Sequence, residues 1–131
     1  MNIYCIAEIG INHNGDLELA KQLVDAAASA KADAVKFQTF RAEHLVSHNT
    51  PKAEYQMHTT DSTESHFDMI RNLELPEFYH EELIKYSKSK GIMFLSTPFD
   101  MFSLNLLTKN FDLQTIKIPS GEITNAPLLL Q

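Results

Sequence analysis

The chain has 131 residues, enough for about one domain with a buried core, and its 44% hydrophobic and 21% charged residues are ordinary for a globular protein. Its net charge of -6 argues against a general nucleic-acid or anionic-membrane surface, because such surfaces need basic patches. No apolar stretch approaches the roughly 20 residues that span a bilayer, no basic leader precedes the first apolar run, and the single Cys5 fits a reducing compartment, so we expect a cytoplasmic protein.

Short apolar runs alternate with helix-like stretches in the first half of the chain. Residues 3–9 predict a buried strand, and Asp16, after a turn-rich segment, predicts the N-cap of a helix. Residues 34–40 predict a second strand, because β-branched and aromatic residues fill its middle. The polar residues 41–65 then form a long connection, and loops of that length are usually binding loops or lids.

The second half of the chain continues the alternation. A helical pattern covers residues 66–73, and Pro76 fits the first turn of another helix that ends at Gly91. The remaining expected elements are strands at 92–96 and 115–119 and helices at 101–109 and 126–131.

The resulting β-α-β-α-β-α-β order predicts an α/β fold with a parallel sheet and right-handed crossovers. An open doubly wound sheet and a (β/α)8 TIM barrel both have this order. No GxGxxG follows the first strand, so the dinucleotide-binding open sheet has no support. A barrel needs eight units and typically about 250 residues. We therefore interpret residues 1–131 as about the first four βα units, the N-terminal half of a barrel domain.

Two lysines within expected strands are the most informative polar residues. Ligands of parallel α/β folds bind at the carboxyl ends of the strands. Lys36 and Lys117 each lie between apolar neighbours, and burying an unpaired ammonium costs several kcal/mol, so both require anions. Glu8 and Glu122 are able to supply the anions as internal salt bridges, and a multiply charged ligand is the alternative. Further donors for such a ligand are the hydroxyls of Ser96, Thr97 and Ser120 and the amides around Gly121.

His13, in the turn after the first strand, has three interpretations. It is a metal ligand, a general base, or a loop residue that hydrogen-bonds its own turn, and a lone histidine is most often the last. The end of the first strand has no His-x-His pair, which argues against a metal-dependent hydrolase on the same fold.

Five motifs occur in register along essentially the whole chain: AEIGINHNGD (7–16), AVKFQTF (34–40), PKAEYQ (51–56), STPFD (96–100) and KIPSGEITN (117–125). Together they resemble the sialic acid synthase family, the N-acetylneuraminate synthases in particular. The resemblance implies a (β/α)8 barrel that condenses phosphoenolpyruvate with the open-chain aldehyde of N-acetylmannosamine, giving N-acetylneuraminate and phosphate. It also implies a divalent metal, Mn²⁺ or Mg²⁺, that polarises the aldehyde.

The resemblance assigns roles to the positions that match. It implies phosphoenolpyruvate contacts from Lys36, Thr97, Lys117 and Ser120, catalytic carboxylates at Glu8 and Glu122, and weaker candidates for sugar contacts at Gln38, Tyr55 and Gln56. The metal-ligating histidines of the family are expected beyond Gln131, as are the second half of the barrel and a C-terminal antifreeze-like domain. That domain implies a homodimer of the full-length protein. Lys31 occupies a helix-end position where the family commonly has glycine.

Two alternatives stay open at the level of sequence. The first is a synthase for a related nonulosonic acid, legionaminic or pseudaminic acid, because these enzymes share the motifs. The second is a non-catalytic half-barrel that binds a phosphorylated metabolite. In either case we expect no synthase activity from residues 1–131 alone, since the metal site lies outside them.

Overall fold

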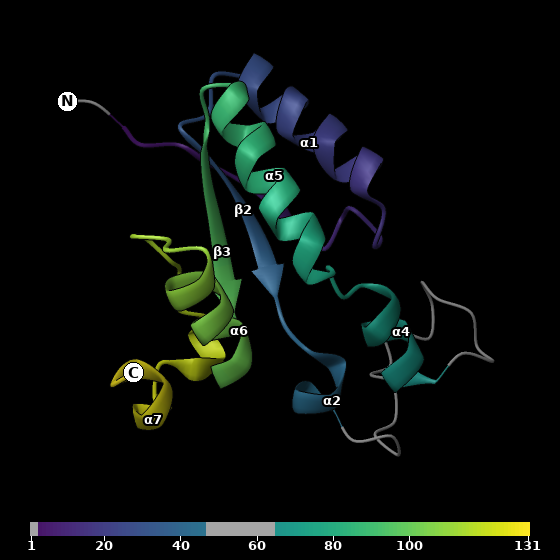
Figure 1. Ribbon diagram of the computed structural model, residues 1–131, viewed down its shortest axis with the longest axis vertical. Coiled ribbons are helices and arrows are strands. Elements are labelled where there is room, and N and C mark those ends of the chain that lie inside the picture. Colours follow the sequence, from purple (N-terminus) through teal and green to yellow (C-terminus); the bar gives the residue numbers. More distant parts are fainter. Residues whose placement is uncertain (1–2, 47–64) are drawn as a thin grey trace.

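The computed structural model describes residues 3–46 and 65–131 (Figure 1). Helices and strands alternate along the chain as the sequence predicts. In chain order the elements are β1 (Ile6–Gly10), α1 (Leu17–Ser29), β2 (Ala34–Thr39), α2 (Ala42–Leu45), α4 (His66–Asn72), α5 (Glu77–Ser89), β3 (Met93–Pro98), α6 (Met101–Asn105), the π-helix η1 (Leu106–Asn110), the 3-10 helix η2 (Ser120–Glu122) and α7 (Ala126–Leu129).

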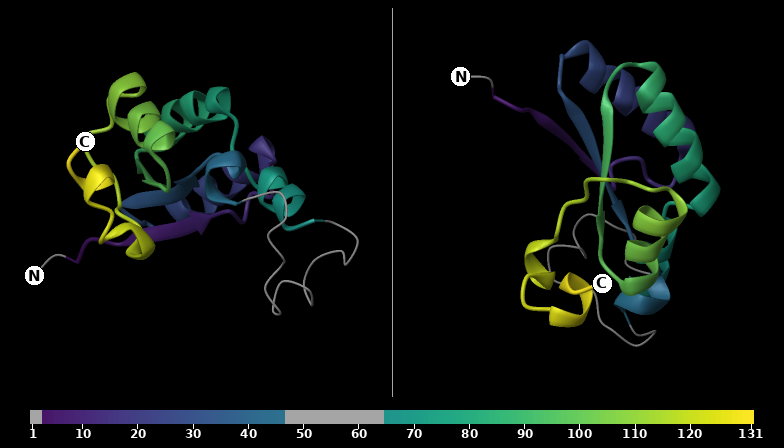
Figure 2. Two further views of the ribbon diagram at one scale, coloured as in Figure 1. Left: turned by 90° about the horizontal axis from the view of Figure 1, so that it is seen from below. Right: turned by 60° about the vertical axis from the view of Figure 1, so that its left-hand side comes forward.

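The strands form one parallel sheet in the order β1-β2-β3. Helices α1 and α5 lie side by side on one face of this sheet, and the C-terminal segment, yellow in Figure 2, lies on the other side of the strands. An α/β fold with a parallel sheet is therefore confirmed. The sheet has 3 strands in the part of the chain that the structure describes, one fewer than the sequence predicts.

The missing strand is the one predicted at residues 115–119, and that prediction is wrong. The segment has no regular secondary structure, although the backbone N–H of Lys117 donates to the carbonyl of Ser96 at 3.1 Å. A strand is defined by a ladder of such bonds, and this contact makes one rung. The apolar residues Ile116 and Ile118, which suggested the strand, are half-buried without a continuous ladder.

The ends of the two long helices follow their sequence signals. The Asp16 carboxylate caps α1 by accepting from the Leu19 N–H at 2.8 Å, as predicted. Beyond the other end of α1, Lys31 adopts a left-handed φ of 61°, so the position does have the geometry that usually selects glycine. Helix α5 begins after Pro76 and is followed by Gly91 at φ 73°.

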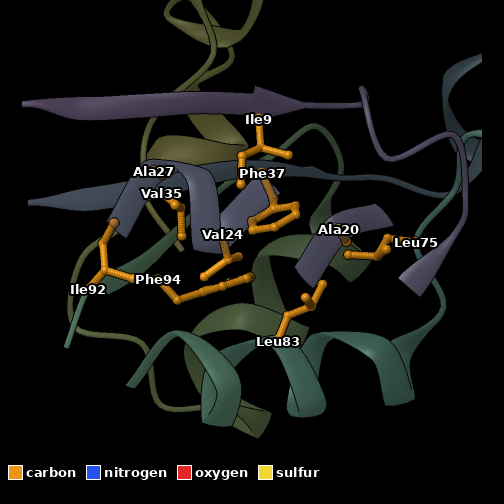
Figure 3. Close-up of a cluster of buried hydrophobic side chains, with 10 residues drawn as sticks. All are labelled: Ile9, Ala20, Val24, Ala27, Val35, Phe37, Leu75, Leu83, Ile92 and Phe94. Atoms are coloured by element: carbon orange, nitrogen blue, oxygen red, sulfur yellow. The ribbon is translucent and has the colours of Figure 1, made fainter. Parts of the chain in front are cut away.

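The core fills the layer between the sheet and helices α1 and α5. The rings of Phe37 and Phe94 stack there with centroids 5.1 Å apart. Burying side chains of this size contributes about 1.5–3 kcal/mol each, so the layer is the main source of stability. Figure 3 shows its members: Ile9, Ala20, Val24, Ala27, Val35, Phe37, Leu75, Leu83, Ile92 and Phe94.

A buried polar chain extends this layer toward the carboxyl ends of the strands. Nε2 of His80 lies 2.8 Å from Oγ1 of Thr39, which lies 2.6 Å from Oγ of Ser96. Nδ1 of His80 lies 3.1 Å from the carbonyl oxygen of Pro76, so Nδ1 carries the proton and Nε2 accepts. Burial lowers the pKa of His80 to about 4, which keeps the ring neutral.

Among the described residues, no helix combines the length and apolarity needed to cross a membrane.

Candidate active site

Alternate residues of β2 face opposite sides of the sheet. Val35 and Phe37 belong to the hydrophobic layer under α1 and α5, whereas Lys36 contacts side chains of both neighbouring strands on the opposite face. Gln38 shares that face because it lies two residues further along the strand. The face that carries Lys36 and Gln38 is therefore separate from the core.

Lys36 is the centre of the polar cluster on this face. Lys36 is only 8% exposed. Its Nζ lies 2.6 Å from Oε2 of Glu8 and donates to Oγ1 of Thr97 at 3.1 Å. The register explains these contacts, since Glu8 pairs with Lys36 across β1 and β2, and Gln38 pairs with Thr97 across β2 and β3. An internal salt bridge from Glu8 to Lys36 is confirmed.

A β-bulge shapes the β1 side of the cluster. The register shifts between Glu8 and Gly10, and Gly10 has a φ of 57°. A Cβ atom at Gly10 would lie 3.1 Å from Oε1 of Glu8 and 3.6 Å from Nε2 of Gln38. The absence of a side chain at Gly10 thus leaves space in which the Glu8 carboxylate and the Gln38 amide converge. Sequence reasoning missed Gly10, although it stands in the first of the five motifs.

Lys117 differs from Lys36 in its surroundings. Its side chain is exposed, while its backbone is held beside the end of β3 by the bond to Ser96. The expectation that both lysines are enclosed is therefore met by Lys36 and is wrong for Lys117 in this structure. The physical reason is that residues 115–119 form no strand, so no ladder fixes which way successive side chains point.

Ser120 and Glu122 lie in the short helix η2, on the segment that follows Lys117. Ser120 is exposed, and the half-buried Glu122 accepts from Nδ2 of Asn125 at 2.6 Å. The described partner of Glu122 is thus an amide, whereas the sequence offered it as an ion-pair partner for a lysine. The two remaining sugar candidates, Tyr55 and Gln56, lie outside the described residues.

His13 is fully buried and hydrogen-bonds the backbone of its own turn. Its Nδ1 accepts from the Gly15 N–H at 3.0 Å, and burial lowers the pKa of the ring. Its role as a loop residue that hydrogen-bonds the turn is therefore confirmed. Within residues 3–46 and 65–131, no three His, Cys, Asp or Glu side chains gather as a metal would require.

Asp100 organises the loops at this end of the sheet, a role that the sequence analysis did not assign. Its carboxylate accepts from the Ser103 N–H at 2.9 Å, from the Ser103 hydroxyl at 2.7 Å and from the Arg41 N–H at 3.1 Å. Nδ1 of His44 lies 3.2 Å away. Burial alone would raise the pKa of Asp100, but the hydrogen bonds from Ser103, His44 and Arg41 outweigh it and lower the pKa. The available signal was its place as N-cap of α6.

The Arg41 side chain makes a second set of contacts for the loop after β2. Its guanidinium lies 2.6 Å from Oε1 of Glu74 and 4.8 Å from the ring centroid of Phe102, and Oε2 of Glu74 accepts from the Ala42 N–H. These contacts join the loop after β2 to the segment before α5 and to α6.

Lys36 lies in the middle of β2, and its ammonium reaches Thr97 near the carboxyl end of β3, which is the edge where parallel α/β folds bind their ligands. Comparison with known proteins is more specific: the NeuB family matches residues 23–131, and the chain belongs to that family.

The chain is similar to two synthases of known product. It is 52% identical over 124 residues to the N,N'-diacetyllegionaminic acid synthase of Campylobacter jejuni, covering 95% of this chain and 37% of that enzyme. It is 49% identical over 129 residues to the enzyme of the same name from Legionella pneumophila, covering 98% of this chain and 36% of that enzyme. The chain therefore belongs to a family of enzymes and spans a little over a third of the length of these relatives.

The fold is similar to a solved structure of the same group. The N-acetylneuraminic acid (sialic acid) synthetase of Leptospira borgpetersenii, in complex with citrate, superposes with a TM-score of 0.80 at 34% identity. The match covers 98% of this chain and 40% of that structure.

Proposed function

We propose that the chain is the N-terminal half of the barrel domain of a synthase that condenses phosphoenolpyruvate with an N-acetylated amino-sugar aldehyde. The product is a nonulosonic acid, and phosphate is released. The observation that carries the proposal is the nearly buried Lys36 ammonium, held between Glu8 and Thr97 on the face of the sheet that is not used for the core. The hydrophobic layer does not use this cation, and because its partner Glu8 is half-exposed, a trianionic donor is able to share the ammonium with that carboxylate.

The chemistry joins the enol carbon of phosphoenolpyruvate to the aldehyde carbon of the sugar. Water then adds to the cationic carbon that results, and the carbon–oxygen bond to phosphate breaks, so the inputs are the two substrates and one water. The Lys36 ammonium and the Thr97 hydroxyl bind the anionic donor, and the Lys117 ammonium and the Ser120 hydroxyl complete its site.

Two carboxylates handle protons in this proposal. Glu8 lies next to Lys36 and is half-exposed, so it reaches both the donor and solvent. Glu122 lies on η2, on the segment that carries Lys117 and Ser120. Gln38, Tyr55 and Gln56 are proposed to contact the sugar. A divalent metal, Mn²⁺ or Mg²⁺, that would polarise the aldehyde belongs to the same proposal, and because residues 3–46 and 65–131 offer no cluster of His, Cys, Asp or Glu ligands, its ligands would have to come from elsewhere in the protein.

The preferred sugar acid is N,N'-diacetyllegionaminic acid, because the two synthases described above, at 52% and 49% identity, are named for this product. N-acetylneuraminate, made from N-acetylmannosamine, is the second candidate, supported by the sialic acid synthetase at 34% identity. Pseudaminic acid is a third member of the same chemical class. A cytoplasmic location and a homodimer of the full-length protein belong to the same proposal.

The proposal is tested first by donor binding. Isothermal titration of phosphoenolpyruvate into the chain is expected to give saturable binding that Lys36→Ala abolishes. Lys85→Ala is a suitable control, because Lys85 is an exposed lysine on α5 paired with Glu81. Binding that is equal in all three proteins would reject the assigned site.

Turnover is tested in a chain extended to the length of its relatives, supplied with Mn²⁺, phosphoenolpyruvate and either N-acetylmannosamine or a 2,4-diacetamido sugar. Phosphate release that depends on the sugar, with mass-spectrometric detection of the sugar acid, is the expected result. Donor binding by the extended protein without turnover of any sugar favours the alternative, a non-catalytic module that binds a phosphorylated metabolite.

A further inference from the structure

The buried polar chain of His80, Thr39 and Ser96 lies on the core side of the sheet, opposite the polar cluster, and takes no part in the proposed chemistry. Thr39 lies two residues beyond Phe37 on β2, so its side chain points to the same side as that ring. Ser96 has the same relation to Phe94 on β3. The Ser96 hydroxyl, which the sequence offers to a ligand, is therefore turned into the core.

The partners fix the direction of every hydrogen bond in this chain. The carbonyl of Pro76 only accepts, so Nδ1 of His80 donates to it at 3.1 Å and Nε2 is left as an acceptor. Oγ1 of Thr39 therefore donates to Nε2 at 2.8 Å and accepts from Oγ of Ser96 at 2.6 Å. Because each hydroxyl has a single proton, both are held in one orientation.

Ser96 connects this chain to the other face of the sheet through its backbone. Its carbonyl oxygen accepts from the Lys117 N–H at 3.1 Å. The next residue, Thr97, accepts from the Lys36 ammonium at 3.1 Å on the opposite face. A shift of the Ser96 backbone would therefore move the Thr97 hydroxyl and the Lys117 segment together. The chain that begins at His80 reaches the backbone of two of the four residues proposed to bind the donor.

His80 also contacts the segment of Lys117 directly. Its ring stacks on Phe111 with centroids 6.0 Å apart and planes inclined by 15°. Phe111 precedes Lys117 in the segment that joins η1 to η2, where residues 112–119 form neither helix nor strand. A further backbone bond in this segment runs from the Leu113 N–H to the Leu107 carbonyl at 3.0 Å. Because a segment without a ladder is held by few contacts, the two that involve His80 weigh heavily in where Lys117 lies.

We propose that His80 is a positioning residue for the phosphoenolpyruvate site. Acting through Thr39 and Ser96, it fixes the place of Lys117 relative to the buried ammonium of Lys36. His80 touches no substrate itself. This inference rests on the proposed function and adds that donor binding depends on a side chain of α5, on the far side of the sheet from the donor.

Hydrogen exchange of the Lys117 amide, followed by NMR, tests the positioning without any ligand. Thr39→Val puts a methyl group in place of the hydroxyl, and we expect this amide to exchange about five-fold faster, as for the loss of roughly one hydrogen bond. Thr39→Ser keeps the hydroxyl and should restore the original rate. Val24→Ala, a change in the core on α1, is the control and should leave this amide unchanged. The same acceleration in Thr39→Ser or in Val24→Ala would overturn the proposal.

Donor affinity is measured by calorimetry in the unchanged chain and in Lys117→Ala, each with and without Thr39→Val. We expect Thr39→Val to weaken phosphoenolpyruvate binding about five-fold in the unchanged chain and less than about two-fold in Lys117→Ala, because changes that act through one contact are not additive. A purely structural role of Thr39 would weaken both proteins by the same factor. That outcome, or no effect in either protein, would overturn the proposal.

A second variant covers the case in which Thr39→Val does not fold, as judged by circular dichroism. Ser96→Ala removes the hydroxyl at the other end of the polar chain, and it should give the same faster exchange at Lys117 and the same non-additive loss of donor affinity. Full protection of the Lys117 amide in Ser96→Ala would contradict the proposal.

Lys36→Ala separates this inference from the proposed function. If the unchanged chain binds phosphoenolpyruvate, Lys36→Ala does not, and Thr39→Val binds as tightly as the unchanged chain, the positioning role fails and the proposed function stands. If the unchanged chain does not bind phosphoenolpyruvate, the assigned donor site fails, and the exchange of the Lys117 amide alone decides whether the His80 chain positions that segment.

Discussion

Glu8 and Lys36 form an ion pair but differ in burial, so replacing one or the other is expected to lower the free energy of unfolding by different amounts. Lys36 is 8% exposed, whereas the Glu8 side chain is 53% exposed. In Glu8→Gln the ammonium stays buried with only the Thr97 hydroxyl and a neutral amide, and an undercompensated buried charge costs about 2 kcal/mol here. In Lys36→Met the carboxylate that is left turns into water and the methionine keeps most of the packing, so the expected cost is about 0–1 kcal/mol.

Urea unfolding of both variants at pH 7, followed by circular dichroism, measures this difference. We expect Glu8→Gln to lose about 1–2 kcal/mol more of the free energy of unfolding than Lys36→Met. A loss in Lys36→Met that equals or exceeds the loss in Glu8→Gln would refute the reasoning, because it would show that the half-exposed carboxylate, not the buried ammonium, depends on the pair.

Donor binding is expected to follow the opposite order in the same two variants. Lys36→Met removes the cation and should weaken phosphoenolpyruvate binding at least ten-fold, since a hydrogen bond to a charged group contributes about 1.5–3 kcal/mol. Glu8→Gln removes the internal competitor for the ammonium, so its affinity should be equal to that of the unchanged chain or higher. Calorimetry on both variants tests whether stability and binding separate in this way.

Three further predictions concern the scaffold. Burial lowers the pKa of His80 from 6.5 to about 4, so as the pH falls the unfolded chain binds the proton before the folded chain does. The free energy of unfolding is therefore expected to have its full value above about pH 6.5 and to fall by roughly 3 kcal/mol toward pH 4. Urea melts across this range should show a smaller loss in His80→Gln, and the same dependence on pH in both proteins would count against the assignment. Gly10→Ala puts a Cβ 3.1 Å from Oε1 of Glu8 at a φ of 57°, so we expect a loss of about 1–2 kcal/mol in thermal melts; a melting temperature equal to that of the unchanged chain would contradict strain at this position. Lys31 has a φ of 61°, so Lys31→Gly should raise the free energy of unfolding by up to about 1 kcal/mol. At Gly91 a Cβ would meet nothing within 4 Å, so Gly91→Ala should lower the free energy of unfolding by about 1 kcal/mol through its φ of 73° alone. A change of the same sign in both variants would contradict this reasoning.

Most of the scaffold was predictable because its signals are local. The cap at Asp16, the breakers Pro76 and Gly91 and the apolar runs of β1, β2 and β3 each act within a few residues. The strand at 115–119 was wrongly predicted for a related reason. Apolar alternation reports that a segment is partly buried, and it carries no information about whether a neighbouring backbone supplies a ladder.

The site was predictable in part. The two-residue spacing of Lys36 and Gln38 is enough to place both on one face of a strand, and the ion pair from Lys36 to Glu8 is one of the two ways in which the sequence offers an anion to that lysine. The contacts of Asp100 with Arg41 and His44 were not predictable, because they join residues more than fifty positions apart through loops without periodicity.

Strand β2 gives its two faces different tasks. Val35 and Phe37 pack in the hydrophobic layer, while Lys36 and Gln38 lie on the opposite face and contribute little to that layer. A substitution at Gln38 is therefore able to change what the second face contacts while the packing under α1 and α5 stays intact.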